Sequence, residues 1–328
     1  MHNNFSKTVF VLLVFFFSSA LFGVDVNLLT HYRNNGIHEI EKELDKKLSE
    51  QSYWDNYLKN IDTSFGYFES CTNILACDKS KSKLSIYKKD DNNTYRLKEE
   101  YSAYTGKIKG DKRKEGDLRT PIGIYDITKK ITKVDSFYGP MAFVTSYPNI
   151  YDKYQGKTGK GIWIHGLPIE QERDEFTKGC IAINNQNIKC LDKNINISKT
   201  ILIIDENNDK KKISKKQISQ VLANLFAWRY SWIYNDINRY LSFYAPKFKR
   251  FDGMNLKQFK KYKTRIFNKN EKKTILFKEI NVVPYPDTKD IFKITFLEKY
   301  KSNSFSFTGN KTLIVKLTEN KFNIITER

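Results

Sequence analysis

Residues 161–166 read Gly-Ile-Trp-Ile-His-Gly, and residues 177–183 read Thr-Lys-Gly-Cys-Ile-Ala-Ile. Both contain a short apolar run of the kind that forms a buried strand. Pairing of the two strands places His165 at the end of one and Cys180 at the start of the other. A histidine lowers the pKa of a nearby thiol, and backbone N–H groups beside a glycine can hold an oxyanion. The sequence therefore predicts a catalytic pair of Cys180 and His165.

The competing interpretation makes Cys180 a small core residue, which is the usual place for a cysteine beside isoleucine and alanine. Two features favour catalysis. The chain has four histidines, and His165 is the only one beyond position 38, so its pairing with a cysteine is less arbitrary than in a histidine-rich chain. Gly179 directly precedes the cysteine and permits an unusual turn or a close backbone approach.

Motifs upstream of the histidine extend the pattern. Thr-Gly-Lys occupies residues 105–107, Gly-Asp-Leu-Arg-Thr-Pro-Ile-Gly-Ile-Tyr occupies residues 116–125, and Ser-Tyr-Pro-Asn occupies residues 146–149, followed by Asp152. With the segments around His165 and Cys180, this order resembles the YkuD-type L,D-transpeptidase family. That family has a histidine, a spacer of similar length and then Ser/Thr-x-Gly-Cys. The resemblance covers roughly residues 83–205.

The resemblance implies a β-rich catalytic domain with a role for each motif residue. Cys180 is expected to be the nucleophile, and His165 its proton acceptor and donor. The carbonyl of Gly166 is expected to orient the imidazole, as an aspartate does in other triads. The backbone N–H groups of Gly179 and Cys180 are the expected oxyanion donors.

Two positions depart from the family pattern. Most family members have histidine before the Gly-Cys pair and arginine two residues after the cysteine, where this chain has Lys178 and Ala182. Because that arginine is expected to hold a substrate carboxylate, its absence argues against ordinary cross-linking. Thr177 and Lys178 are expected to shape access to the acyl-enzyme, and Lys178 to attract a carboxylate.

The variant sequence and the additional C-terminal region resemble the L,D-carboxypeptidases that set helical cell shape in curved Gram-negative bacteria. Those enzymes trim the tetrapeptide stems of peptidoglycan to tripeptides by removing D-alanine. Two alternatives stay open. One is an L,D-transpeptidase or a hydrolase of protein–peptidoglycan linkages, and the other is a peptidoglycan-binding protein without catalytic activity.

The N-terminus has the features of a secretory signal peptide, predicted for residues 1–23. Lys7 precedes an apolar core at residues 9–17, and small residues follow, so we expect cleavage between Ala20 and Gly23. The alternative is an uncleaved membrane anchor. No later stretch is apolar enough to span a bilayer, so the sequence predicts a periplasmic protein that contacts the membrane only through an uncleaved signal.

The chain is strongly basic, with 57 Lys and Arg against 37 Asp and Glu and a net charge of +20. Such a field attracts anionic partners. Export excludes nucleic acid as the partner, whereas the carboxylates of peptidoglycan stems suit the charge. A compositional bias toward lysine explains part of the excess.

The four cysteines, Cys71, Cys77, Cys180 and Cys190, leave the disulfide pattern open. Cys71 and Cys77 either close a small loop by a disulfide or remain thiols, and a bond between Cys180 and Cys190 would disable the proposed chemistry. No Cys-x-x-Cys pair or histidine cluster indicates a zinc site, and no cofactor is predicted.

The predicted fold class is α+β, with four regions. Residues 1–23 are the signal peptide, residues 24–82 a helical segment, residues 83–206 the catalytic domain and residues 207–328 a C-terminal domain. Helical periodicity is clearest over residues 25–63, and this segment is expected to cover the catalytic domain or to form a homodimer. Strands are expected within the catalytic domain at residues 84–87, 95–98, 122–127, 141–144 and 200–204, with a short helix at residues 185–191.

The C-terminal domain is expected to begin with a helix behind a capping box at Ser214 and Gln217 and to continue helically to Tyr244, before Pro246. Residues 274–327 then alternate as three or four antiparallel strands. Helices followed by a curved sheet resemble the NTF2-like cone. This order of elements predicts an enclosed pocket.

The residues predicted to line that pocket are aromatic, with one lysine, Lys311 or Lys316, meeting a ligand carboxylate. The competing interpretation is core packing for the aromatic residues and solvation for the lysines. The aromatic candidates are Trp228, Trp232, Tyr240 and Tyr244.

Overall fold

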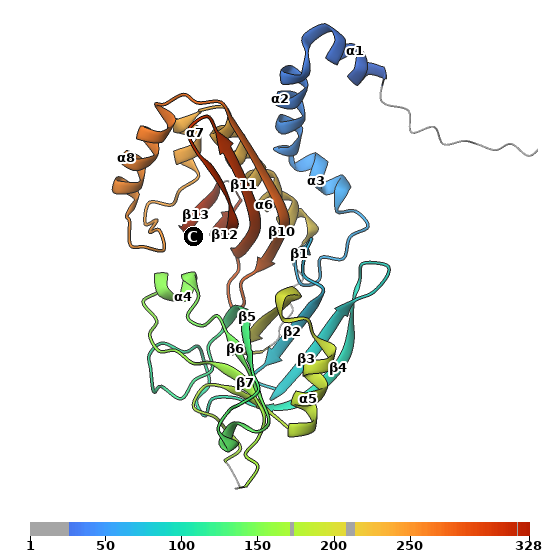
Figure 1. Cartoon of the computed structure of the whole chain (residues 1–328), viewed down its shortest axis with the longest axis vertical. Coiled ribbons are helices and arrows are strands. Elements are labelled where there is room, and N and C mark those ends of the chain that lie inside the picture. Colours follow the sequence, from blue (N-terminus) through green and yellow to red (C-terminus); the bar gives the residue numbers. More distant parts are fainter. Residues whose placement is uncertain (1–25, 171–173, 208–213, 320) are drawn as a thin grey trace, which may run out of the picture. The chain divides into compact units, whose positions relative to one another are not determined.

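The computed structural model describes residues 26–170, 174–207, 214–319 and 321–328 (Figure 1). The chain forms two units, residues 1–45 and residues 46–328, which are described separately here. The predicted signal peptide lies outside the described residues. Within the described residues, no helix combines the length and the apolar character needed to cross a bilayer.

The first unit contains helix α1, Val26–Asn35, and most of helix α2, Ile37–Leu48. Gly36 separates the two helices with a φ of +78°, a conformation that glycine adopts without steric penalty. The predicted N-terminal helices are therefore confirmed. Several large apolar side chains of these helices are exposed, namely Leu28, Leu29, Tyr32, Ile37 and Leu44.

The second unit contains a closed barrel whose strands follow the order β2-β3-β4-β8-β7-β6-β5-β9. This barrel confirms the predicted β-rich catalytic domain. The helices among its strands are η1 (Ser136–Tyr138), α4 (Ile150–Tyr154), α5 (Asn185–Asn194) and η2 (Ile197–Lys199). The strands are β2 (Asn73–Asp78), β3 (Lys83–Lys89), β4 (Tyr95–Tyr104), β5 (Gly123–Ile131), β6 (Ala142–Thr145), β7 (Trp163–His165), β8 (Ile181–Ile183) and β9 (Thr200–Asp205).

Strand β2 lies in a stretch that the sequence analysis placed in the helical segment. All of its residues are buried, and it pairs antiparallel with β3 and parallel with β9. A strand buried on both faces gives a continuous apolar run instead of an alternating pattern. For this reason the run from Ile74 to Cys77 has no strand periodicity to detect.

The barrel core fixes the direction of the catalytic candidates. Ile164 of β7 and Ile181 of β8 are fully buried in it, together with Leu75, Leu84 and Leu202. Each such side chain stabilises the fold by about 1.5–3 kcal/mol relative to exposure. Successive side chains of a strand point to opposite faces. The residues next to Ile164 and Ile181 in sequence therefore share the other face of the sheet.

The C-terminal part contains three helices and a five-stranded antiparallel sheet, in the order β1-β10-β11-β12-β13. Helix α6, Lys215–Ile233, begins at the predicted capping box of Ser214 and Gln217. The strands are β1 (Tyr67–Phe68), β10 (Lys273–Pro284), β11 (Ile291–Ser302), β12 (Ser306–Thr318) and β13 (Lys321–Glu327).

The helical region after α6 differs from the expected continuous helix. The chain leaves α6 at Tyr234, Asn235 has a φ of +60°, and helix α7, Ile237–Ser242, starts after its N-cap Asp236. A further helix, α8, Leu256–Phe267, was not predicted. Its Asn255–Gln258 capping box is nevertheless visible in the sequence.

One large apolar core joins the three helices to the C-terminal sheet. Helix α3, Gln51–Tyr57, joins the same core, because the rings of Trp54 and Phe226 stack at 5.2 Å. The helices followed by a curved antiparallel sheet have the order of elements that the sequence predicts for this domain (Figure 1).

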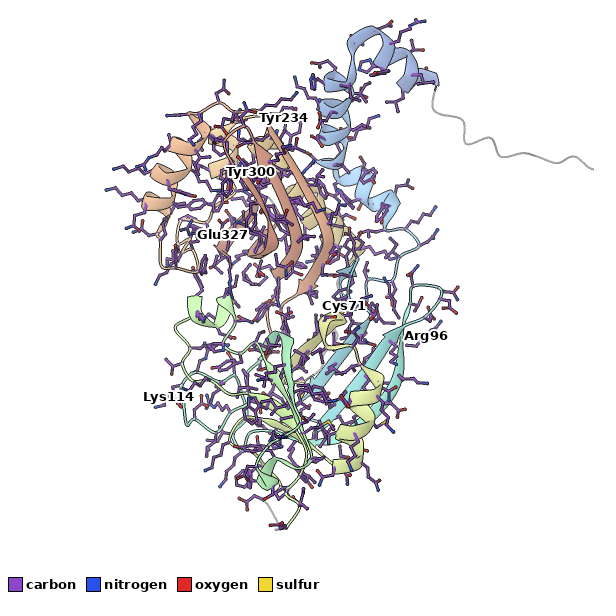
Figure 2. All side chains as sticks on the ribbon, viewed as in Figure 1. Cys71, Arg96, Lys114, Tyr234, Tyr300 and Glu327 are labelled. Carbon is purple, nitrogen blue, oxygen red and sulfur yellow. The ribbon has the colours of Figure 1, made fainter. Side chains whose placement is uncertain are left out.

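The barrel and the C-terminal sheet contact each other directly. Lys293 of β11 forms an ion pair with Asp126 of β5 at 3.2 Å, and Asn149 donates a hydrogen bond to the Tyr285 hydroxyl at 2.9 Å. Cys71, labelled in Figure 2, belongs to the apolar cluster at this junction. Strand β1, which precedes the barrel in sequence, pairs with β10 of the C-terminal sheet.

Candidate active site

The predicted pair lies on two neighbouring parallel strands. In the ladder between β7 and β8, Ile164 is opposite Ile181, and His165 is opposite Ala182. Continuing this register, Cys180 is level with Trp163, two residues behind His165. Cys180 and His165 therefore belong to the same face of the sheet, on adjacent strands and offset by one strand repeat of about 6–7 Å along the strand direction.

His165 is held in one orientation. Its side chain is almost completely buried, and its Nδ1 lies 2.6 Å from the carbonyl oxygen of Gly166. A carbonyl oxygen only accepts, so Nδ1 carries the hydrogen and Nε2 of the neutral ring is the proton acceptor. The Tyr138 ring stands edge-on at 5.0 Å from the imidazole. The Gly166 carbonyl thus occupies the place that the family resemblance predicts for it.

The segment after His165 is fixed by neighbouring loops. The Gly166 N–H donates to the Tyr138 carbonyl at 2.9 Å, and the Leu167 N–H donates to Oδ1 of Asn185 at 2.8 Å. Asn185 begins helix α5, which lies after the nucleophile strand as predicted. The carbonyl that orients the imidazole is therefore itself held in place.

Cys180 directly precedes β8 and is partly exposed, which suits a nucleophile that must meet a substrate. Its Sγ lies 3.5 Å from the carbonyl oxygen of Gly161. All four cysteines lie within the described ranges, and all are thiols. The disulfide between Cys180 and Cys190 that would disable the site is not formed.

The question of the Cys71–Cys77 disulfide is also answered by the fold. Both residues are buried thiols, and the chain between them runs through extended strand β2. At about 3.3 Å per residue, an extended segment of this length separates the two residues well beyond disulfide reach. Burial raises the pKa of Cys71 to about 11 and that of Cys77 to about 12, so neither is a thiolate at neutral pH.

Thr177 fastens the turn that carries the nucleophile. Its buried hydroxyl accepts a hydrogen bond from the Gly179 N–H at 3.0 Å and donates to the Cys180 carbonyl at 2.6 Å. The backbone of Thr177 also bonds to Thr105 and Lys107, at 2.7 Å and 3.2 Å. The Thr-Gly-Lys motif at residues 105–107 therefore holds the turn that carries Cys180 through these two backbone hydrogen bonds.

These bonds bear on two of the predicted roles. The Thr177 hydroxyl bonds within the turn and so holds the backbone that carries Cys180. The Gly179 N–H already donates to that hydroxyl, which removes it from the predicted oxyanion donors in this conformation. Lys178, between them, has an exposed side chain at the rim of the site.

Replacement of Thr177 by valine should lower kcat by about 10–100-fold. The Cys180 thiol would be present but displaced from its reactive position, and such a displacement slows the reaction. The valine leaves the Gly179 N–H without its acceptor and the Cys180 carbonyl without its donor. Thr177→Ser keeps the hydroxyl and should retain activity within about threefold. Steady-state kinetics of both variants, with melting curves, test this role, and equal activities for valine and serine would contradict it.

Gly179 and Arg119 meet behind the turn. Gly179 has a φ of +134°, and a Cβ placed on it would lie 2.8 Å from the carbonyl oxygen of Arg119. The Nε of Arg119 is buried and has no hydrogen-bond partner among the described residues. Arg119 belongs to the Gly-Asp-Leu-Arg-Thr-Pro motif, whose pattern alone predicts no role for it. The backbone of Arg119 lies directly beside the nucleophile turn.

The position of the family arginine is occupied by an alanine in this chain. Ala182 is fully buried and lies opposite His165 in the ladder. Among the described residues, no cluster of three or more His, Cys, Asp and Glu side chains is arranged to hold a metal ion.

The C-terminal domain has a cavity of about 440 Å³, which two of the predicted pocket residues line, Trp232 and Lys311. Trp228, Tyr240 and Tyr244 are core residues instead. The Tyr244 hydroxyl donates to Glu327 at 2.9 Å, and Figure 2 labels Glu327 at the end of the C-terminal sheet. Lys316, the alternative lysine, does not line the cavity and pairs with Asp290 at 3.4 Å.

Lys263, which sequence analysis did not select, also lines this cavity. Its Nζ lies 4.4 Å from the Trp232 ring and 5.3 Å from the Tyr240 ring. Burial lowers the pKa of Lys263 to about 8. Lys311 Nζ, on the same cavity, lies 3.5 Å from the buried carboxylate of Glu327. The cavity lining therefore includes charged groups that are buried or paired with a buried carboxylate, which lowers the stability of the folded state.

Replacement of Lys263 by methionine should stabilise the fold at pH 7 by about 1–3 kcal/mol. The folded-state pKa lies below the unfolded value, so the folded protein binds the proton less well. The destabilisation of the folded state by the charged Lys263 is complete below pH 8, and it disappears as the pH rises toward 10.5. Melting temperatures at pH 7 and pH 10 test this, with the exposed Lys257→Met on the same helix as control. A less stable Lys263→Met protein at pH 7 would contradict it.

Comparison with known proteins agrees with the barrel, the site and the C-terminal cone. Residues 72–204 match the YkuD family, described as the L,D-transpeptidase catalytic domain, and residues 220–328 match the Cds6 C-terminal NTF2-like domain. The fold and the site thus define a YkuD-type protein with an NTF2-like domain. The chain belongs to the YkuD L,D-transpeptidase family, as the motifs predicted.

Two solved structures resemble the chain over most of its length. The helical cell shape determining protein Pgp2 from Campylobacter jejuni is 38% identical, with a TM-score of 0.78 over 86% of this chain and 100% of that one. Bd1075 from Bdellovibrio bacteriovorus is 28% identical, with a TM-score of 0.66 over 82% of this chain and 97% of that one.

A further relative matches over a shorter stretch. The YafK protein of Escherichia coli (strain K12) is 35% identical over 96 residues, which is 29% of this chain and 35% of YafK. The chain therefore spans about a third of the length of this curated relative.

Proposed function

We propose that the protein is a periplasmic peptidoglycan L,D-carboxypeptidase that trims tetrapeptide stems to tripeptides and thereby influences cell shape. The observation that carries the proposal is the pairing of β7 with β8, which puts His165 and Cys180 on one face of the barrel. The hydrogen bond from His165 Nδ1 to Gly166 leaves Nε2 as the base. The similarity to a helical cell shape determining protein supports the biological role.

The proposed reaction passes through a thioacyl-enzyme. His165 Nε2 takes the thiol proton, and the Cys180 thiolate attacks the carbonyl carbon of the third stem residue. The backbone N–H of Cys180 is the proposed oxyanion donor. Collapse of the tetrahedral intermediate breaks the peptide bond, and D-alanine leaves with the proton from His165. Water, deprotonated by His165, then attacks the thioester, releasing the tripeptide and returning the proton to the thiol.

Recognition of the leaving residue requires a cation, because D-alanine carries the terminal carboxylate. Ala182 supplies none, so we assign this task to Arg119 and Lys178, which flank the nucleophile turn. A guanidinium forms two parallel hydrogen bonds to a carboxylate. The buried Nε–H of Arg119 has no hydrogen-bond partner among the described residues. Lys178 adds charge at the rim.

Further parts of the chain have proposed roles in the same setting. Residues 1–23 would direct export, and the exposed apolar residues of α1 and α2 would form a homodimer contact. Lys311 and Trp232 would hold part of the substrate in the C-terminal cavity. No nucleic-acid partner is proposed.

A mass-spectrometric assay tests the activity. The protein without residues 1–23 is incubated with purified tetrapeptide muropeptide, with tripeptide muropeptide as the control substrate. Loss of one alanine from the tetrapeptide alone supports the carboxypeptidase. Cross-linked dimers would indicate the transpeptidase that the family match also allows, and unchanged substrate would indicate a binding protein.

A further inference from the structure

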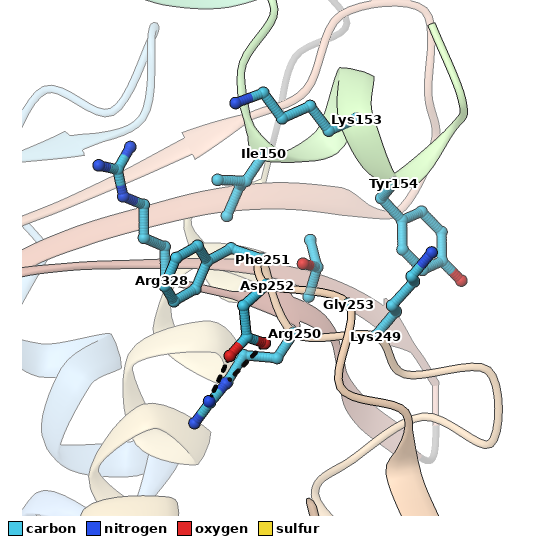
Figure 3. A pocket seen from close by; sticks show the side chains of 10 residues that line it. Ile150, Lys153, Tyr154, Lys249, Arg250, Phe251, Asp252, Gly253 and Arg328 are labelled. Atoms are coloured by element: carbon cyan, nitrogen blue, oxygen red, sulfur yellow. Dashed lines mark hydrogen bonds and ion pairs between the residues drawn. The ribbon is translucent and has the colours of Figure 1, made fainter.

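A second cavity lies where the barrel meets the C-terminal domain, and we call it the junction pocket. It measures about 390 Å³, and its lining includes Ile150 and Lys153 of α4 and Lys249, Phe251 and Arg328 of the C-terminal part (Figure 3). A volume of this size falls within the range of ligand pockets. Neither part forms the pocket alone.

The junction pocket carries an excess of positive charge. Lys153, Lys249 and Arg328 are exposed cations on its lining, and no ion pair joins any of them to a carboxylate of the described residues. Asp252 is the acidic residue among the lining residues, and Arg250 neutralises it through a hydrogen bond of 3.0 Å from Nε and a second from Nη2. Three side-chain charges are thus left for a ligand.

The walls of the pocket are held by backbone hydrogen bonds. The N–H groups of Lys249 and Phe251 donate to carbonyls of β13, at 3.2 Å and 3.0 Å, and the Arg250 N–H donates to Met254 at 2.9 Å. The Tyr154 hydroxyl ties α4 to the same loop through the Lys247 carbonyl at 3.1 Å. A site built in advance loses less ordering entropy when a ligand binds.

Apolar surface lies between the cations. Phe251 is 55% exposed, and the Arg328 guanidinium lies 5.8 Å from the centroid of its ring. Figure 3 shows Ile150, Lys153, Phe251 and Arg328 among the side chains that line the pocket. Separated cations beside an exposed aromatic ring suit an extended ligand with several carboxylates and aliphatic groups. A lone phosphate would need convergent donors, and a bilayer would need a protruding apolar face.

We propose that the junction pocket binds an acidic stem peptide of peptidoglycan that is not being cleaved, and so tethers the enzyme to the wall. The inference rests on the proposed substrate class, but not on turnover at Cys180. A second attachment on the same polymer raises the effective concentration of the catalytic site near further stems. The pocket would therefore favour polymeric wall over small soluble fragments.

The test compares binding to purified sacculi with turnover of soluble tetrapeptide muropeptide. The Lys153→Glu/Lys249→Glu variant should need about tenfold more protein for half-saturation of sacculi in sedimentation, which corresponds to about 1.4 kcal/mol. Its turnover of the soluble muropeptide should stay within twofold of the parent. Both side chains are exposed, and melting curves check that the fold is retained.

The matched control is Lys98→Glu/Lys260→Glu, which makes the same charge change at exposed positions elsewhere. It should bind sacculi as the parent does. Equal loss of sacculus binding in the two variants, or no loss in either, would overturn the proposal. Binding to vesicles of anionic phospholipid is measured alongside, and a Lys153→Glu/Lys249→Glu protein that lost only vesicle binding would also overturn it. Absence of turnover in every protein, with the binding difference intact, would count against the carboxypeptidase and leave the tether supported.

Discussion

Cys180→Ala should abolish release of D-alanine from tetrapeptide muropeptides, with turnover reduced by at least about 1000-fold. The sulfur forms the covalent bond of the proposed acyl-enzyme, and no neighbouring group replaces it. The partly exposed side chain loses little volume, so the melting temperature should change by no more than a few degrees. Mass spectrometry of the products and a melting curve measure the two effects.

Cys190→Ala is the matched control for this experiment. Cys190 is also a partly buried thiol, and it lies in α5, where the Asn194 side chain donates to its sulfur at 3.2 Å. Its replacement should leave turnover within about twofold. A Cys180→Ala protein that still trims stems, or a Cys190→Ala protein that does not, would show that the nucleophile has been assigned to the wrong sulfur.

The placement of the candidate pair, Cys180 and His165, on neighbouring strands could be predicted from the sequence because it depends on local pattern. The apolar runs before His165 and after Cys180 specify strands, and the motif order specifies that they pair. The role of Thr177 could not be read in the same way. Its hydroxyl bonds within the turn, while its backbone bonds to Thr105, far away in sequence. A contact across the barrel has no signal in spacing.

The C-terminal domain shows the same limit on a larger scale. Helix α6 follows its capping box, but the aromatic residues at helical spacing do not reveal which of them face a cavity. Trp232 reaches the cavity, whereas Trp228, one helical turn earlier, is enclosed by the core. The burial of Lys263 could not be predicted from the sequence, because its neighbours on α8 are charged and typical of a solvated face. Tertiary packing nevertheless buries it.

The exchange of the family arginine for Ala182 bears on the choice between hydrolysis and cross-linking. The alanine is fully buried opposite His165 and supplies no cationic side chain in that position. The acyl-enzyme step is common to both reactions, so the outcome depends on which acceptor reaches the thioester. The proposed hydrolysis follows if a site without that arginine binds a second peptide weakly, because water needs no such binding residue.

Gly179→Ala should lower kcat by about 100-fold while the barrel stays folded. The φ of +134° is strained for any residue with a Cβ, and the added atom would lie 2.8 Å from a backbone oxygen of Arg119, which cannot rotate away. The turn must then shift, and it carries both the Cys180 sulfur and the proposed oxyanion donor. Kinetics at saturating muropeptide, with a melting curve, report the effect.

Gly156→Ala separates the two causes in this prediction. Gly156 also has a positive φ, +73°, but a Cβ there would meet nothing within 4 Å. That variant should lose some stability from backbone strain alone and keep its kcat. If both variants lost kcat equally, general strain in the barrel would explain the result. If neither variant lost kcat, the nucleophile would tolerate displacement. The close packing of Thr177, Gly179 and Arg119 around the turn would then have no part in catalysis.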